Sequence, residues 1–370
     1  MILNWIGPVF GQSGYEVITR GMLFALDRLG VDIRLIPVDN WNKEQVSLRD
    51  DEKFRLYRLA SRRSEIDAPV IMHQKMQAEA IQFKNKYCYT LFETDRIPQN
   101  WMVDLLAMTK VFTFSKFIGD RWIKNGFPAS KLKILSFGLD KLKFENAKPM
   151  KVLNAKDFIF LTNGDYTERK NFEALIQAYV EEFSNQENIT LIIKAHYKGF
   201  GRRHKNMLKE IIQKEIKKYN KKDIPQILFC GDKVAEDCMP AFYKGGNCFV
   251  LPTHGEGLGL PFIEAMYSGI PCIATRWGSQ LDYMDDENSF LVGGKEQCIN
   301  SIGYITQCPH ALNHRWFEVD IEDLKRTMRS AFENKYILPI IGKNAKLTIQ
   351  KYDWHYTAIE ILREIFGGHK

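Results

Sequence analysis

The stretch Val250–Ala274, VLPTHGEGLGLPFIEAMYSGIPCIA, decides the fold of this chain. The apolar residues 248–251 predict a buried parallel strand, and the sequence GEGLG that comes shortly after them predicts a loop. Residues 261–268 have the pattern of a short helix, and residues 271–275 have that of the next strand. A strand, a loop, a helix and a second strand in this order form the repeating unit of a doubly wound parallel sheet.

The loop of this unit is expected to bind an anion such as a diphosphate. Pro261 suits the first helical position, where its missing N–H would have no partner, and Gly269 suits the end of the helix. The positive end of the helix then lies behind free backbone N–H groups, those of Gly257, Leu258, Gly259 and Leu260. Glu256 in the loop and Glu264 one turn into the helix can both face the cleft at the carboxyl end of the sheet. For such a loop taken alone, a tight turn with two solvated glutamates is the favoured alternative.

The first half of the chain shows the alternation of strands and helices that a parallel sheet requires. The strand ILNWIG leads to the loop GQSG, in which Gly11, Ser13 and Gly14 lie, and then to an amphipathic helix. Two polar groups stand at the ends of later strands, namely His73 and the run Glu93-Thr94-Asp95. A structural role is favoured for His73. The later strands are predicted at residues 31–37, 69–73, 87–92, 111–114 and 131–137.

A stretch rich in lysine and asparagine predicts a linker, with the domain boundary near Lys148. The segments DFIFLTNG, ITLIIKA, QILFC and NCFVLP then predict the core strands of a second domain. The loop GDYTERKN carries Arg169 and Lys170 just ahead of an amphipathic helix. Cations are repelled by the positive end of a helix, so their presence there favours a bound anion. Arg can hold such an anion with its planar fork and Lys as a point charge.

Composition excludes several classes of protein. At 370 residues, of which 45% are hydrophobic, the chain is long enough for two domains with a core each. It has no apolar run near the roughly 18 residues of a membrane-spanning helix and does not begin like a signal peptide, so a cytoplasmic protein is expected. Its seven cysteines include no Cys-x-x-Cys pair and no Cys/His cluster, which argues against a disulfide framework and a structural zinc site.

The net charge of +7 is concentrated in one segment. Residues 202–222 contain nine Lys or Arg and two Glu, so the rest of the chain is neutral. Apolar residues recur in this segment with helical spacing, which favours an outer helix with a solvated basic face over nucleic-acid binding. A second basic helix, residues 49–63, has a narrow apolar stripe at Phe54, Tyr57 and Ala60. A solvated face is favoured there too, with peripheral contact to the inner membrane face as the alternative.

Taken together, these motifs resemble those of retaining GT-B glycosyltransferases, in particular glycosyltransferase family 4. EGLGLPFIE, residues 256–264, matches the E-x7-E signature of that family, and RKN in the loop GDYTERKN matches its R-K-N motif. The loop GQSG, the turn SFGLD and the closing segment YDWHYTAIEILREIF also resemble the family. In the run YTLFETDRIPQNW, Glu93 stands where other members carry a His near the reacting sugar. Asp165 departs from relatives that have a second Arg there.

The resemblance implies two Rossmann-like α/β domains, residues 1–148 for the acceptor and residues 149–350 for the nucleotide sugar. Residues 351–370 are expected as a helix that packs back on the first domain. The implied reaction moves a hexose from a UDP- or GDP-sugar to a glycan, lipid-linked or other hydroxyl acceptor, with retention of configuration. No cofactor and no metal ion are expected, since Arg169 and Lys170 can stabilise the leaving diphosphate.

The resemblance also implies roles for individual residues. The catalytic residues are expected to be Glu256, Lys170, Arg169 and Glu93. The residues that bind the donor are expected to be Gly11, Ser13, Gly14, Gly257, Leu258, Gly259, Leu260 and Glu264. Glu256 is expected to face the transferred sugar, and Glu264 is expected to hold the ribose hydroxyls.

Two other functions stay open at this point. One is a nucleotide-sugar epimerase with the GT-B fold, which needs no acceptor. The other is a non-catalytic protein that binds sugar nucleotides or nucleic acid through the basic helix 202–222. The sequence also leaves open the sugar, the base, the acceptor and its linkage, the oligomeric state, and whether His73 or Glu93 takes part in chemistry.

Overall fold

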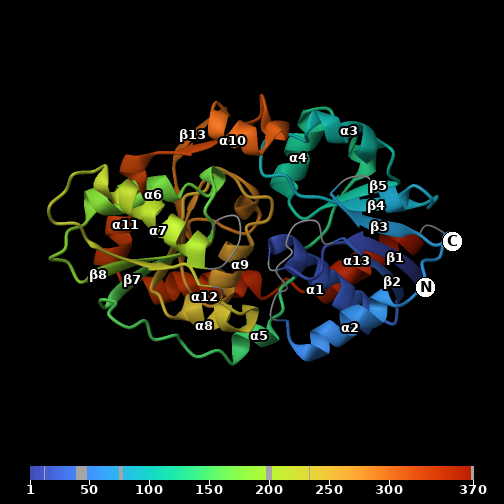
Figure 1. Cartoon of the computed structure of the whole chain (residues 1–370), viewed down its shortest axis with the longest axis horizontal. Helices are drawn as coiled ribbons and strands as arrows, with labels where there is room; N and C mark the ends of the chain where they lie inside the picture. The colour runs from blue at the N-terminus through green and yellow to red at the C-terminus, as the bar shows by residue number, and fades with distance from the viewer. Residues whose placement is uncertain (12, 39–47, 75–77, 197–201, 233, 368–370) are drawn as a thin grey trace. The chain divides into compact units, whose positions relative to one another are not determined.

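The computed structural model describes residues 1–370 except 12, 39–47, 75–77, 197–201, 233 and 368–370. The chain divides into two compact units: residues 1–141 together with 352–370, and residues 142–351 (Figure 1). The sequence predicts a boundary near Lys148, whereas the first unit ends at Lys141. The short helix α5 (Leu142–Glu145) belongs to the second unit, because Phe144 packs edge-on against Tyr267 there.

The first unit is built on a six-stranded parallel sheet with the strand order β2-β1-β3-β4-β5-β6. Its strands are β1 (Ile2–Gly7), β2 (Asp32–Pro37), β3 (Val70–His73), β4 (Lys86–Tyr89), β5 (Lys110–Thr113) and β6 (Leu132–Ile134). Its helices are α1 (Gly14–Arg28), α2 (Asp50–Ala60), α3 (Gln99–Leu106), α4 (Lys116–Lys124) and α13 (Trp354–Phe366), with 3-10 turns η1 (Ala78–Ala80) and η2 (Ala129–Lys131). Buried apolar strands with helical crossovers between them are the pattern that a parallel sheet needs.

The C-terminal helix α13 is part of this first unit. Its Trp354 lies so close to the glycine of the turn SFGLD that a Cβ on Gly138 would be 2.2 Å from the backbone nitrogen of Trp354. Glu360 accepts hydrogen bonds from both the backbone N–H and the hydroxyl of Ser136, each at 2.8 Å. The chain therefore returns to the first unit after Lys351. Contacts of Trp354 and Glu360 with the segment that contains Ser136 and Gly138 hold α13 in place.

The second unit repeats the architecture with the strand order β12-β11-β10-β7-β8-β9, again all parallel. Its strands are β7 (Phe158–Asp165), β8 (Ile189–His196), β9 (Gln226–Cys230), β10 (Cys248–Leu251), β11 (Cys272–Thr275) and β12 (Phe290–Val292). Its helices are α6 (Phe172–Glu182), α7 (Arg202–Lys217), α8 (Met239–Lys244), α9 (Leu260–Tyr267), α11 (Ile321–Glu333) and α12 (Leu338–Ile349), with 3-10 turns η3 (Glu168–Lys170), η4 (Glu236–Cys238) and η5 (Ser279–Asp282). The prediction of two doubly wound parallel sheets is confirmed.

Helices cover both faces of the second sheet. Figure 1 shows α6, α7 and α11 grouped on one face and α8, α9 and α12 grouped on the other, and the contacts between these helices follow the same grouping. The basic helix α7 packs its apolar stripe into the core through Leu208 and Ile212, which are 1% and 3% exposed. The predicted division of this helix into a packed apolar face and an outer basic face is therefore what the described residues show.

A small antiparallel pair is added to the second unit between β12 and α11. It consists of β13 (Gly294–Cys298) and β14 (Arg315–Val319), joined through α10 (Ile302–Gln307) and the 3-10 turn η6 (Pro309–Ala311). A core of its own, formed by Ile299, Ala311 and Trp316, holds the insertion together.

Helix α2 differs from its sequence pattern. The apolar stripe expected at 54, 57 and 60 is not the buried face, since Phe54 is 71% and Tyr57 58% exposed, whereas Leu56 and Leu59 are buried. Its Arg55 and Arg58 both donate to Asp27 at 2.8 Å. Across the described residues, no helix combines the length and the apolar character needed to cross a membrane.

Candidate active site

The predicted motifs of the second unit meet where the strand order of its sheet reverses. From β7 the sheet grows through β8 and β9 in one direction, and through β10, β11 and β12 in the other. The loops that follow β7 and β10 therefore diverge above two neighbouring strands, the place where open α/β sheets bind ligands. The first of these loops carries Arg169 and Lys170, and the second carries Glu256.

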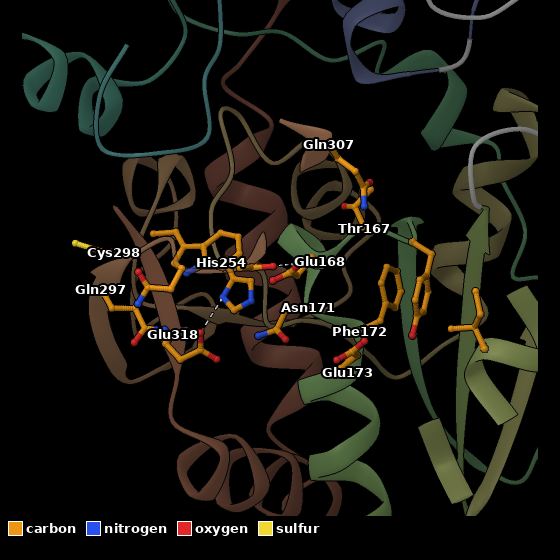
Figure 2. A pocket seen from close by; sticks show the side chains of 15 residues that line it. Thr167, Glu168, Asn171, Phe172, Glu173, His254, Gln297, Cys298, Gln307 and Glu318 are labelled. Carbon is orange, nitrogen blue, oxygen red and sulfur yellow. Dashed lines mark hydrogen bonds and ion pairs between the residues drawn. The ribbon is translucent and has the colours of Figure 1, made fainter. Parts of the chain in front are cut away.

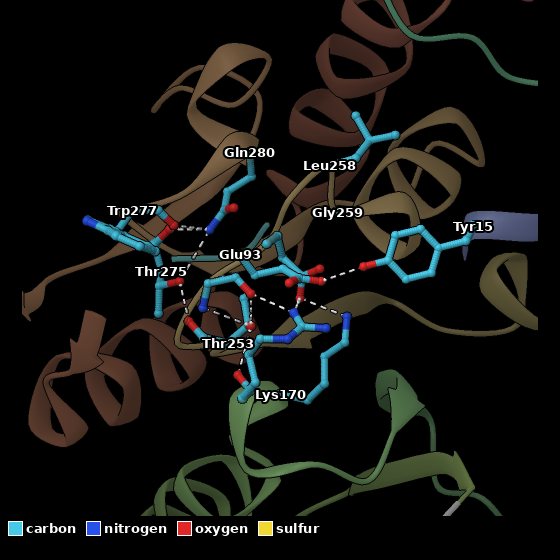
Figure 3. Close-up of polar contacts among 12 residues, drawn as sticks. Tyr15, Glu93, Lys170, Thr253, Leu258, Gly259, Thr275, Trp277 and Gln280 are labelled. Carbon is cyan, nitrogen blue, oxygen red and sulfur yellow. Dashed lines mark hydrogen bonds and ion pairs between the residues drawn. The ribbon is translucent and has the colours of Figure 1, made fainter. Parts of the chain in front are cut away.

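Three predicted catalytic residues form one cluster at this point. Lys170 Nζ donates to Glu256 Oε1 at 2.7 Å, and Arg169 Nη1 lies 3.2 Å from the same oxygen. Arg169 Nη1 also donates to the Gly255 carbonyl at 2.6 Å (Figure 3). Burial alone would raise the pKa of Glu256, but the charges of Lys170 and Arg169 outweigh burial and hold that pKa below its usual value. The cluster therefore contains two cations for one carboxylate.

Lys170 is buried, with 7% of its surface exposed, whereas its place in a loop predicts an exposed side chain. It ends the turn η3, and the residue after it, Asn171, has a left-handed backbone with φ of 54°. The Asn171 side-chain oxygen accepts from Ala174 N and so caps α6. This tight connection turns the lysine inward, and its stem passes over Gly164, where a Cβ would be 3.5 Å from Lys170 Cε.

The glycine loop ahead of α9 has the expected form. Gly259 has a left-handed backbone, with φ of 76°, which favours glycine, and a Cβ there would be 2.6 Å from the Tyr283 hydroxyl. That hydroxyl donates to the Leu258 carbonyl at 2.7 Å and fixes the loop. Helix α9 begins at Leu260, with Pro261 in its first turn. Among the described residues, the N–H groups of 257–260 donate to no other group, so they are available to an anion.

Glu264 lies on α9 and takes part in a separate polar chain. Tyr243, on α8, donates its hydroxyl proton to Glu264 at 2.8 Å and accepts from Asn163 Nδ2 at 3.2 Å. Lys194 in turn donates to Asn163 Oδ1 at 3.2 Å. Burial outweighs the hydrogen bond from Tyr243 and raises the pKa of Glu264 to about 7. Glu256 and Glu264 thus occupy electrostatically different surroundings.

The raised pKa of Glu264 predicts a pH-dependent contribution to stability. The folded chain keeps this proton up to about pH 7, whereas the unfolded chain loses it near pH 4.5. Between these values the folded state binds more protons, so the free energy of unfolding falls as the pH rises. Glu264→Gln should remove that part of the fall, while Glu322→Gln, at a glutamate 67% exposed, should not. Urea unfolding at one pH below and one above this window measures the change in the free energy of unfolding. The same change in the parent and in Glu264→Gln would contradict this prediction.

Three residues of this site are missing from the sequence prediction. Tyr243 is one, because its place opposite Glu264 depends on the packing of α8 against α9. The other two are Thr253 and His254, which lie directly before the glycine loop. The Thr253 hydroxyl and the backbone N–H of His254 donate to the Arg169 carbonyl at 2.9 and 2.8 Å. The sequence contains a signal for these two residues, because Thr253 and His254 are polar and follow a buried strand directly before the glycine loop.

The first unit holds the remaining predicted donor-binding residues in and next to the loop after β1. Gly11, Ser13 and Gly14 lie at the start of α1, where the Ser13 hydroxyl donates to the carboxylate of Glu16. A Cβ on Gly11 would be 2.2 Å from Glu16 Oε1, so this loop closes tightly around the carboxylate. Arg20 Nη1 donates to the Gly11 carbonyl at 2.8 Å. Burial raises the pKa of Glu16.

Glu93 follows β4 and lies near the same helix. Tyr15 on α1 donates its hydroxyl proton to Glu93 Oε1 at 3.3 Å (Figure 3). His73, at the end of β3, is buried between aromatic rings, with ring centroids 4.7 Å from Tyr15 and 5.0 Å from Tyr89. Desolvation lowers the pKa of His73 to about 3, so this imidazole is neutral at physiological pH.

Comparison with known proteins identifies relatives of this arrangement. Residues 155–306 match the sequence model of the family described as glycosyl transferases group 1. Sulfoquinovosyl transferase SQD2 of Arabidopsis thaliana is 30% identical over 141 residues, which are 38% of this chain and 24% of that protein. The serotype-specific mannosyltransferase WbdA of Escherichia coli is 24% identical over 280 residues, which are 75% of this chain and 29% of that protein. The chain thus spans about a quarter of the length of these curated relatives.

Among solved structures, HepE of Anabaena, in complex with UDP-glucose, superposes with a TM-score of 0.68 at 14% sequence identity. The superposition covers 99% of this chain and all of that one. At this identity the likeness shows a shared fold. It confirms the fold that the sequence motifs predict, two Rossmann-like domains of the GT-B type.

Proposed function

We propose that this chain is a retaining glycosyltransferase, because residues 155–306 match the sequence model of the family described as glycosyl transferases group 1. It moves a hexose from a nucleoside-diphosphate sugar to a hydroxyl of a glycan or lipid-linked acceptor. The observation that carries the proposal is the cluster of Lys170, Arg169 and Glu256 at the reversal of the strand order. Two cations, a helix N-terminus and a carboxylate in one place suit a ligand that combines a diphosphate with a sugar.

In the proposed reaction, the bond between the anomeric carbon and the β-phosphate oxygen breaks on the same face on which the acceptor oxygen bonds to that carbon. The acceptor's proton passes to the departing phosphate oxygen. Negative charge grows on the diphosphate, where Lys170, Arg169 and the amides of the glycine loop are placed to stabilise it. Positive charge grows on the sugar, and the negative Glu256 carboxylate stabilises it. We propose that these groups replace a divalent ion.

Glu264 serves the nucleoside in this proposal. Its carboxylate, oriented by the hydrogen bond from the Tyr243 hydroxyl, can accept hydrogen bonds from the two ribose hydroxyls. Uridine is the favoured base, because HepE, with the same fold, is solved with UDP-glucose. The loop Gly11–Gly14 and Glu93 of the first unit are assigned to the donor and to the sugar end of the reaction, as the family resemblance implies.

The test is a thermal-shift screen of UDP, GDP, ADP and their sugars, followed by assays of nucleotide release. A ligand that binds only the folded chain raises its melting temperature, so UDP and UDP-sugars are expected to raise it most. Release of UDP should require an acceptor and should persist in a chelator. Conversion of the donor sugar without any acceptor would instead identify an epimerase. Activity abolished by the chelator and restored by a divalent ion would contradict the metal-independent mechanism.

A further inference from the structure

The second unit contains a cavity of about 630 Å³ that the proposed transfer reaction does not use. Its walls come from the turn after β7, from the start of α6, and from the inserted pair β13–β14 with α10 (Figure 2). Ile211 of α7 also lines it. Glu264 and the glycine loop do not line it. Pockets for small molecules have volumes on the order of 300–1,000 Å³, so this one is large enough for a ligand.

Buried polar atoms line this cavity without partners. Asn171 Nδ2, Trp316 Nε1, the Tyr166 hydroxyl and the Thr167 hydroxyl have no hydrogen bond within the described part of the chain. Asn171 and Trp316 are 7% and 4% exposed, and Figure 2 shows the Asn171 amide turned toward the side that holds His254 and Glu318. Buried polar groups are nearly always satisfied, so this concentration of unpaired ones calls for a bound ligand or ordered water.

The charges of the cavity select the class of ligand. Glu168, Glu173 and Glu318 line it, and no Lys or Arg is among its described lining residues. These carboxylates disfavour phosphate and other anions by repulsion. Two of the three carboxylates already accept bonds, Glu168 from the Ser301 hydroxyl at 2.6 Å and Glu318 from Gln297 at 3.0 Å. The wall offers a mixture of donors and acceptors next to aromatic rings, among them Phe172 and Trp316.

An uncharged sugar fits this wall because each of its hydroxyls both donates and accepts, while its C–H groups can pack against aromatic rings. We propose that the cavity is a second saccharide site, which binds one neutral sugar unit away from the donor. Its assignment to a unit of the acceptor or the product glycan rests on the proposed function, whereas sugar binding itself does not.

The cavity shares one turn of the chain with the candidate active site. Thr167, Glu168 and Asn171 line the cavity, while the residues between them, Arg169 and Lys170, pair with Glu256. His254 also lines the cavity, and its backbone N–H donates to the Arg169 carbonyl at 2.8 Å. A sugar bound here would therefore contact both chain segments that position the two cations.

The experiment measures binding by saturation-transfer NMR, with excess UDP present to occupy the donor site. The probes are methyl α-glucoside and methyl α-mannoside as neutral sugars, glucosamine as a cation and glucose 6-phosphate as an anion. We expect a neutral glycoside to bind and the phosphate not to bind. Asn171→Asp keeps the cap on α6 and tolerates the left-handed backbone but loses the donor. Trp316→Phe keeps the ring stacked on His254 but loses the N–H.

Each variant is expected to bind the glycoside about tenfold more weakly, the scale of one lost buried hydrogen bond. The matched control is Asn154→Asp, the same substitution at an exposed residue that also has a left-handed backbone, with φ of 64°, outside the cavity. Equal affinity in all three variants or no binding of either glycoside would overturn the proposal and leave a water-filled cavity. Binding of glucosamine alone would overturn it in favour of a cation site. None of these readouts needs turnover, so a failure of the proposed transferase activity would be seen separately.

Discussion

Glu256→Gln is expected to lower the turnover number about 100-fold while binding of UDP becomes tighter. The carboxylate now neutralises one of two adjacent cations, Lys170 and Arg169, in a buried place. Its loss raises the local charge by one unit and so strengthens the attraction for a diphosphate. The same loss removes the negative charge opposite the sugar, where positive charge develops in the transition state, and such interactions act on turnover.

The measurement is the turnover number at saturating donor, together with the dissociation constant of UDP. Glu264→Gln is the matched comparison, since it also replaces a carboxylate of the same motif, here a partly buried one, by an amide. Contacts to ribose serve the ground state and the transition state about equally, so this variant should raise the donor Michaelis constant and lose less turnover. Equal turnover losses in the two variants, or weaker UDP binding by Glu256→Gln, would show that this division of roles is wrong.

The sequence predicts the sheet architecture well because hydrophobic periodicity and strand-end glycines are local signals. The unit around β10 and α9 is within one residue of its predicted bounds, since Leu260 rather than Pro261 begins the helix. Gly259 was identified from the spacing of a loop before a helix, and the structure gives the physical reason in its positive φ. Such features depend on the few residues next to them in the chain.

Long-range contacts account for what the sequence does not predict. The burial of Lys170 follows from the left-handed bend at Asn171 and from Glu256, which is 86 residues away. The partner of Glu264, Tyr243, depends on how two helices pack. The roles of individual site residues in catalysis stay predictions, because the structure shows where these residues lie and the experiments above must show what they do.

The cavity beside β13–β14 is a further case of this kind. Its lining residues range from Tyr166 to Glu318, and no motif links them. Trp316 alone reads as an ordinary core residue, and Asn171 alone reads as a helix cap. The pattern of unpaired donors appears only when the inserted strands are placed against the turn after β7.

Lys170→Met is expected to abolish most of the affinity for UDP and to destabilise the fold by about 3 kcal/mol, the lower end of the cost of breaking a buried ion pair. Methionine preserves the length of the stem over Gly164, so packing changes little. What remains is the Glu256 carboxylate, 4% exposed, with Arg169 as its single cation at 3.2 Å. An exposed lysine of the same unit is the control: Lys209→Met, at an exposed side chain on α7, should change stability by less than about 0.5 kcal/mol.

The double variant Lys170→Met/Glu256→Gln separates stability from function. In the Glu256→Gln background, Lys170 is a buried cation that has lost its carboxylate, so replacing it by methionine should cost less than about 1 kcal/mol and can even stabilise the fold. UDP affinity should nevertheless stay at least about tenfold below that of Glu256→Gln, because the diphosphate loses a charge-assisted hydrogen bond in either background. Urea unfolding of the four proteins gives the coupling energy, and calorimetric titration with UDP gives the affinities. Additive stability losses would show that the ion pair is not formed in solution, and unchanged UDP affinity in Lys170→Met would remove this lysine from the proposed diphosphate site.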